Sequence, residues 1–463
     1  MTVHLSKPPR GSVPVHATDR SSFAAHAAAL EPAARRWLRS VGFKGAPDSH
    51  ALLPAADGSI AAVWAGVRDA AHPWALAALP KSLPPGAYLL GDGGLAVDAA
   101  AAVLSWELGS YTFDVYKPAA RAPAQLHLAS SAAVQRALII AAASASTRDL
   151  VNTPAEHMGP AHLAEAVKLV ARQHGARFKQ TVGDKLLTAN FPAIHAVGRA
   201  ADFKGGRAPR LVELNWGYPK HPRITLVGKG VCFDSGGLDI KGADGMRLMK
   251  KDMGGAANAL GLAELIMTRK LPVRLQLLIP AVDNAIAGNA YRPGDVFTTR
   301  AGIAIEIGNT DAEGRVILCD ALAYGAEGQP DLMIDLATLT GAARVALGPQ
   351  LPALFSNRFA LARELMDLGL SMGDPLWHMP LWQGYQAAIA SSIAKIVNTG
   401  ATPQGGAINA ALFLDHFVPA AIDWLHVDLY AWNNASRPGR PAGGEAQGIR
   451  ALLALIEKRY LIK

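Results

Sequence analysis

The chain has 463 residues, of which half are hydrophobic and 18% are charged, with a formal net charge of +8 and two cysteines. This length exceeds the usual limit for one hydrophobic core, so two domains are expected. No apolar run reaches the roughly 18 residues of a membrane span, which excludes a membrane-spanning chain, and the dispersed basic residues are only a weak indication of a nucleic-acid partner.

Residues 1–125 predict a small N-terminal α/β domain. Candidate helices cover Phe23–Val41 and Gly94–Gly109, and candidate strands cover Ile60–Trp64 and Ala87–Leu90. No motif of recognisable chemistry lies in this part, so we interpret it as a domain for assembly or for shaping the entrance of an active site. The first residues lack the apolar core of a secretory signal, and the two cysteines lie in core-like segments, so a cytoplasmic location is expected.

Residues 126–463 predict a C-terminal α/β domain with a mainly parallel central sheet flanked by helices. Helical patterns at Ala129–Leu150 and Pro160–His174 come first, and short apolar strands then alternate with helices. The strand Ile224–Val227 runs into a glycine-rich stretch that contains Lys229 and Asp234. These two charged side chains therefore follow the carboxyl end of a buried strand.

Two further charged groups occupy similar places. Asp252 precedes the small and apolar helical pattern Gly254–Ile266, while the neighbouring Lys250 and Lys251 read as a solvated basic edge. Between the strand Ala304–Ile307 and the helix Val316–Tyr324, a turn carries acidic and basic side chains: Asp311, Glu313 and Arg315. Loops at the carboxyl ends of strands form the ligand crevice of open α/β sheets.

Four carboxylates in one crevice would repel one another unless cations lie between them. These are Asp234, Asp252, Asp311 and Glu313. Two divalent ions would resolve the repulsion, and oxygen-rich sites suit Mg, Mn, Co or Zn. A pair of ions held about 3.5–4 Å apart is a hydrolytic device, so metal-assisted hydrolysis is the expected chemistry.

The basic residues need separate roles. Lys229 can ligate a metal only as the neutral amine, whereas Lys241 is better placed as an ammonium that polarises a substrate carbonyl or its oxyanion. Arg315 can hold a small anion, or it can pair with a neighbouring carboxylate. The chain has no phosphate-binding loop of the Gly-x-x-x-x-Gly-Lys type and no Gly-x-Ser-x-Gly nucleophile elbow.

Three segments together resemble the signature segments of the leucyl aminopeptidase, or cytosol aminopeptidase, family. They are Val227–Gly237, Met249–Ala257 and Asn309–Arg315, and supporting similarity runs from about Arg148 to the C-terminus. The resemblance implies a metalloaminopeptidase that removes N-terminal residues from peptides. It also implies two divalent ions, with Mn or Zn expected first, and a homo-oligomer, specifically a hexamer.

The resemblance assigns roles to individual residues. A tightly bound ion would be held by Lys229, Asp234, Asp252 and Glu313, and an exchanging ion by Asp234, Asp311 and Glu313. In the family a metal-bridging water attacks the scissile carbonyl, the lysine that matches Lys241 stabilises the oxyanion, and a bicarbonate held by the arginine that matches Arg315 acts as general base. The substrate would be bound by Met249, Thr338, Leu339 and Gly341, whose apolar lining favours leucine-like side chains.

Two alternatives come from other classes of protein. The first is a DNA-binding regulatory protein that retains the peptidase fold, and the second is a catalytically silent structural member. The positive charge is dispersed and aromatic interleaving for base stacking is absent, so nucleic acid is not the expected partner. Every position that the resemblance makes catalytic or metal-binding is intact, which favours the enzyme.

Overall fold

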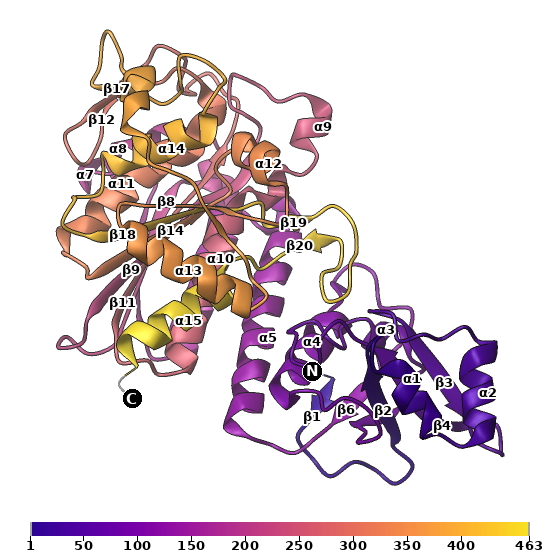
Figure 1. Cartoon of the computed structure of the whole chain (residues 1–463). Coiled ribbons are helices and arrows are strands. Elements are labelled where there is room, and N and C mark those ends of the chain that lie inside the picture. Colours follow the sequence, from indigo (N-terminus) through magenta and orange to yellow (C-terminus); the bar gives the residue numbers. More distant parts are fainter. Residues whose placement is uncertain (1, 462–463) are drawn as a thin grey trace. The chain divides into compact units, whose positions relative to one another are not determined.

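The computed structural model describes residues 2–461, which divide into two compact units (Figure 1). The first unit comprises Met1–Ala145 and Asn433–Ala442, and the second comprises Ser146–Trp432 and Gly443–Lys463. The division between Ala145 and Ser146 lies within the long helix α5 (Ala132–Asn152). The domain boundary placed at residue 125 stays a prediction.

The first unit contains a six-stranded sheet in the order β1-β6-β5-β2-β4-β3. Within the described residues, the β3–β4 pair is antiparallel and the other pairs are parallel. The strands are β1 (Val3–His4), β2 (Val13–Thr18), β3 (His50–Pro54), β4 (Ile60–Gly66), β5 (Ala87–Leu90) and β6 (Gln125–His127). The helices are α1 (Phe23–Ala28), α2 (Pro32–Ser40), α3 (Leu79–Ser82) and α4 (Ala99–Ser110). The predicted small α/β domain is confirmed.

The single helix predicted over Phe23–Val41 is wrong, because the structure has two helices there. Helix α1 ends at Ala28, and α2 begins at Pro32 after Glu31, whose backbone is extended with φ −52° and ψ 145°. The proline ring disfavours helical geometry in the residue before it and supplies a helical φ of its own. Proline therefore starts a new helix instead of continuing the old one.

The second unit contains a nine-stranded sheet. Its order is β16-β15-β18-β14-β9-β11-β8-β7, with β10 paired to β11 off this path. The central neighbours β18, β14, β9 and β11 are parallel, and β10 is parallel to β11. The strands are β7 (Arg177–Val182), β8 (Arg210–Trp216), β9 (Arg223–Gly228), β10 (Gly230–Asp234), β11 (Arg274–Asn284), β14 (Leu332–Ala337), β15 (Ala353–Ser356), β16 (Trp377–His378) and β18 (Asp423–Asp428). The mainly parallel sheet is confirmed.

Helices cover both faces of this sheet (Figure 1). One face carries α8 (Pro192–Gly198) and α11 (Glu313–Glu327), and the other carries α10 (Gly254–Thr268) and α15 (Ile449–Tyr460). A Cβ at Gly325 of α11 would meet the Thr225 side chain, whereas one at Gly228 would meet Ala256 of α10. Since Thr225 and Gly228 are three residues apart on β9, their side chains point to opposite faces. The sheet is thus the middle of three layers.

Helix α10 lies very close to the sheet because its first turns are made of glycine and alanine. A Cβ at Gly255 would come within 2.1 Å of the Leu336 carbonyl oxygen of β14. Only glycine permits this approach, which confirms the tightly packed helix predicted from Gly254 onward.

Shorter elements connect and border these layers. The helices are α6 (Pro160–Gln173), α7 (Lys185–Thr188), α9 (Ala243–Met246), α12 (Gly341–Leu347), α13 (Phe359–Ser371) and α14 (Gly406–Asp415). The 3₁₀ and π segments are η1 (Ala155–His157), η2 (Phe203–Arg207), η3 (Met249–Met253), η4 (Thr310–Ala312) and η5 (Gln383–Ile389). Small strands are β12 (Val296–Thr298), β13 (Ala304–Glu306), β17 (Ile396–Val397), β19 (Trp432–Asn433) and β20 (Gly443–Gly444).

The prediction for the two cysteines is met by the described residues. Cys232 and Cys319 are free and fully buried, as expected of small core side chains. Across residues 2–461, no helix combines the length and the apolar character that crossing a membrane requires.

A buried polar cluster links the adjacent strands β14 and β18. Asp335, fully buried, faces His426 in the strand register. Its carboxylate lies 2.6 Å from His426 Nδ1 and accepts a hydrogen bond of 2.7 Å from Trp424 Nε1. Burial lowers the pKa of His426, but the Asp335 carboxylate outweighs that effect and raises it. Asp335 thus joins the side chains of His426 and Trp424 within the core of the sheet.

Replacing this carboxylate tests its contribution to stability. We expect Asp335→Ala to lower the free energy of unfolding by about 3–5 kcal/mol, because a buried imidazole and a buried indole N–H lose their partner. Asp335→Asn retains an acceptor for Trp424 and should cost less. Urea unfolding of both variants measures this difference, and two variants with wild-type stability would contradict the assignment.

Candidate active site

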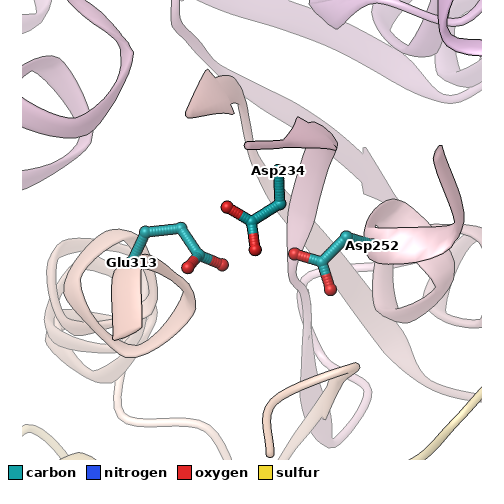
Figure 2. A group of neighbouring side chains, drawn as sticks. All are labelled: Asp234, Asp252 and Glu313. Carbon is teal, nitrogen blue, oxygen red and sulfur yellow. The ribbon is translucent and has the colours of Figure 1, made fainter. Parts of the chain in front are cut away.

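Carboxylates from three separate elements converge at the carboxyl edge of the sheet in the second unit. Asp234 is the last residue of β10, Asp252 lies in η3, and Glu313 is the first residue of α11. Each offers an oxygen, and these oxygens lie within 4.8 Å of one another (Figure 2). Their side chains point toward one shared space, and all three residues are at most 3% exposed. The convergence predicted for these carboxylates is present.

Lys229 lies among these carboxylates, directly after β9. Its Nζ is 2.8 Å from Asp252 Oδ2 and 2.8 Å from Glu313 Oε1, and it donates a 2.8 Å hydrogen bond to the Thr338 carbonyl oxygen. The lysine reaches this position because residue 314 is glycine: a Cβ there would lie 2.7 Å from Lys229 Cε and Nζ. The Glu-Gly pair at the start of α11 thus makes room for the amine.

Lys241 covers the cluster on another side. Its Nζ is 2.8 Å from Asp234 Oδ2 and also contacts Asp311 Oδ1. Asp311, in η4, is more exposed than the other three carboxylates and stands outside their 4.8 Å group. The fourth predicted carboxylate therefore borders the cluster and is joined to it through Lys241.

The crowding of charges changes the pKa values in this cluster. Burial, followed by repulsion from Asp234, raises the pKa of Glu313 well above its usual range, and the same two causes raise that of Asp311 to about 6. Burial would lower the pKa of Lys229, but the carboxylates of Asp252 and Glu313 outweigh it and raise the pKa instead. With protein groups alone the amine is a cation, so metal ligation through it requires ions whose charge displaces the proton.

Several buried oxygens of the cluster have no hydrogen-bond partner among the described residues. They are Asp252 Oδ2 and both carboxylate oxygens of Glu313. Two of them lie within ion-pair distance of Lys229 Nζ, yet without the alignment of a hydrogen bond. Buried carboxylate oxygens with unused lone pairs are the donor set that hard divalent ions take. The residues present therefore fit divalent metals.

Arg315 is the third residue of α11 and is 8% exposed. Its Nη1 donates a 2.8 Å hydrogen bond to the Asn398 carbonyl oxygen, and its Nε has no partner among residues 2–461. Within those residues Arg315 forms no ion pair with Glu313 or Asp311, which was the alternative role expected for this side chain. An unused guanidinium N–H is consistent with the predicted anion site.

Of the residues predicted to bind substrate, Thr338 contacts a carboxylate of the cluster directly. Thr338 Oγ1 donates a 2.9 Å hydrogen bond to Asp252 Oδ1, and the Leu339 N–H donates one of 3.0 Å to Asp428. Gly341 starts α12 and is exposed, and Met249 starts η3, two residues before Lys251. Hydrogen bonds thus hold Thr338 and Leu339 in place, with Thr338 at the edge of the cluster.

Sequence reasoning missed three polar residues that hold the site loops in place. Asn284 donates to Asp234 Oδ1 at 2.9 Å and to the Thr310 carbonyl. Asn398 Oδ1 accepts from the Gly308 N–H, and its side-chain amide donates to the Asn309 carbonyl. Asp428 accepts from two backbone N–H groups after β14. Each is a single polar residue far along the chain from its partners, so no local pattern indicates it.

The prediction that Lys251 lies on a solvated basic edge is wrong. Lys251 is only 5% exposed, and its Nζ lies 4.8 Å from the centre of the Tyr430 ring. Burial, partly offset by attraction to Asp252, lowers its pKa to about 8. Lys250 is half-buried, and its Nζ donates to the Asn152 carbonyl oxygen. The short 3₁₀ turn directs both side chains into the protein.

Comparison with known proteins agrees with this geometry. The catalytic-domain model of the cytosol aminopeptidase family matches residues 145–453, and a model of the M17 aminopeptidase N-terminal domain matches residues 13–129. The chain therefore belongs to the cytosol aminopeptidase family, as its three motifs predicted.

Individual relatives support the assignment. The probable cytosol aminopeptidase of Syntrophotalea carbinolica is 43% identical over 332 residues, covering 71% of this chain. This chain spans 66% of that relative, just under two thirds of its length. The crystal structure of a cytosol aminopeptidase from Coxiella burnetii matches with a TM-score of 0.94 and 47% identity over 99% of both chains. The bottromycin maturation enzyme BotP in complex with Mn matches with a TM-score of 0.86 and 31% identity, over 97% of this chain and 99% of that one.

The cluster predicts a specific pattern of ion binding. We expect wild-type protein to bind two Mn or Zn ions per chain, and Asp311→Asn to retain one, because Asp311 stands outside the tight group of carboxylates. Glu313→Gln should weaken binding of both ions by more than about tenfold. Calorimetric titration of metal-free protein measures stoichiometry and affinity. Two ions bound with native affinity in Glu313→Gln would contradict the assignment.

Proposed function

We propose that this protein is a metal-dependent aminopeptidase that releases N-terminal, preferably leucine-like, residues from peptides. The observation that carries the proposal is the buried group of Asp234, Asp252 and Glu313 around Lys229, with Lys241 and Asp311 at its border. Membership of the cytosol aminopeptidase family and relatives named for that activity support it. Nothing in the comparisons supports a DNA-binding regulator.

In this proposal the carboxylates and the neutral amine of Lys229 hold two divalent ions, Mn or Zn first, with Mg or Co able to replace them. When bound, such ions polarise a carbonyl and make water a nucleophile at neutral pH. Lys229, Asp234, Asp252 and Glu313 would hold one ion, and Asp234, Asp311 and Glu313 the other. Support comes from their unused oxygens and from BotP, which binds Mn in a solved structure.

The remaining residues position and stabilise the substrate. Lys241 donates a hydrogen bond to the oxygen of the scissile carbonyl, which gains negative charge during attack, since its ammonium is at the edge of the cluster and partly exposed. Arg315 would hold bicarbonate through its unused N–H, and such an anion would supply a general base near the metal ions. Met249, Thr338, Leu339 and Gly341 hold the first residue of the peptide.

We further propose a cytoplasmic hexamer in which residues 1–125 serve assembly or shape the entrance. The support is the family resemblance together with the match of residues 13–129 to an N-terminal domain of these enzymes. Mass measurement in solution by light scattering tests the hexamer, and a monomer would contradict it.

Two substitutions separate catalysis from metal binding. We expect Lys241→Ala to lower kcat for leucine arylamide by about 100-fold with two ions still bound, because a donor to the oxyanion is lost. Asp252→Ala should lose both activity and ions, since a ligand is removed. The assay measures turnover with added Mn or Zn, together with metal content by mass spectrometry.

The control is Lys168→Ala, which removes an exposed lysine whose surface ion pair with Glu165 contributes little. It should leave turnover unchanged. Wild-type turnover in both Lys241→Ala and Asp252→Ala would overturn the assigned roles.

A further inference from the structure

Lys251 is a buried basic residue to which the proposed aminopeptidase mechanism assigns no role. Its side-chain amine has no hydrogen bond and no ion pair within the described part of the chain. The nearest carboxylate in sequence, that of Asp252, forms an ion pair with Lys229 Nζ and accepts a hydrogen bond from the Thr338 hydroxyl. Its one close partner is the Tyr430 ring, 4.8 Å away. A ring face offsets only a small part of what an ammonium loses on leaving water.

A second cation lies against the same ring. The guanidinium carbon of Arg344 is 4.8 Å from the Tyr430 ring centre. Arg344 lies on α12, three residues after Gly341, and its side chain is exposed enough to reach solvent. Two basic side chains thus share one aromatic ring, and no acidic side chain is paired with either of them among residues 2–461.

This group lies against the residues proposed to hold the substrate. A Cβ at Gly341 would lie 3.9 Å from Arg344 Nη2, so the arginine side chain passes beside Gly341. Ala431, the residue after Tyr430, and Thr338 both lie close to Gly254 at the start of α10, because a Cβ at Gly254 would meet both side chains. Arg344 therefore lies beside Gly341, and Lys251 directly precedes Asp252, which accepts a hydrogen bond from Thr338.

We propose that Lys251, Arg344 and Tyr430 form a carboxylate subsite beside the catalytic centre, so that substrates carrying a carboxylate near the scissile bond are preferred. This inference rests on the proposed aminopeptidase function and specifies its substrate class. Charge-assisted hydrogen bonds from an ammonium and a guanidinium suit a carboxylate, and partial burial strengthens them. The carboxylate comes from the free C-terminus of a dipeptide or from an acidic first side chain.

Two matched pairs of substrates distinguish these sources. Leucyl-glycine and its C-terminal amide differ only in the terminal carboxylate, and glutamyl and glutaminyl arylamides differ only in the side-chain carboxylate. We expect kcat/KM of the wild-type enzyme to be about tenfold or more higher for the carboxylate member of at least one pair. Equal or higher kcat/KM for both neutral members would overturn the subsite, and this comparison needs no variant.

Variants then assign the preference to these side chains. Lys251→Met keeps an unbranched chain of similar length under the Tyr430 ring and should reduce the ratio within the preferred pair to near one. Arg344→Met, at an exposed position, should reduce it by several-fold. Lys250→Met is the matched control, because Lys250 lies over Trp432 at 5.6 Å and already donates to the Asn152 carbonyl, so it should keep the wild-type ratio.

The outcomes separate the two levels of the proposal. If the metal-loaded wild-type enzyme hydrolyses leucine arylamide but Lys251→Met and Arg344→Met keep the wild-type ratio, the subsite is wrong and the aminopeptidase function stands. If none of the peptides and arylamides is hydrolysed with Mn or Zn, the proposed function fails and the subsite fails with it.

Discussion

Balancing buried negative charge is the constraint on which the catalytic edge of this protein depends. Asp234, Asp252 and Glu313 are almost fully buried within a few ångströms of one another, an arrangement that could not persist if all three stayed ionised without cations. Lys229 and Lys241 supply two positive charges against the four carboxylates of the site, which leaves a formal charge of −2. Burial first, and repulsion from Asp234 second, raise the pKa values of Glu313 and Asp311. The negative surplus is the basis of the affinity for divalent ions that we propose.

The sheet makes this arrangement possible because it brings distant segments to one edge. The parallel strands β9, β10, β14 and β18 all end there, and the loops that follow them supply Lys229, the Asp234 region, Thr338 and the Asp428 region. Neutral donors then fix the loops: Asn284 holds Asp234, and Asn398 holds the turn before α11. Uncharged amides can do this without adding to the electrostatic imbalance, whereas further lysines would compete with metal ions for the carboxylates.

Much of this could be predicted from the sequence, and the rest could not for identifiable reasons. Apolar runs that end in glycine predicted β9 and the strand before Glu313. The charged motifs that follow these strands predicted that the carboxylates converge. No sequence pattern indicates Asn284 or Asn398, because the role of a single amide depends on hydrogen-bond partners far along the chain. The prediction for Lys251 is wrong because two adjacent lysines usually lie in solvent, whereas the direction of a side chain in a 3₁₀ turn follows tertiary packing and not periodicity.

The absence of a side chain at Gly314 has a consequence for chemical reactivity. Lys229 passes so close to the backbone of α11 that a single added carbon there would overlap its terminal atoms. An acyl or alkyl group on the lysine nitrogen would have to fit among closely packed atoms, at a residue that is only 3% exposed. Amine-directed reagents should therefore label exposed lysines such as Lys168 and spare Lys229 while the native packing persists. Labelling of Lys229 would then report local opening around the first turn of α11.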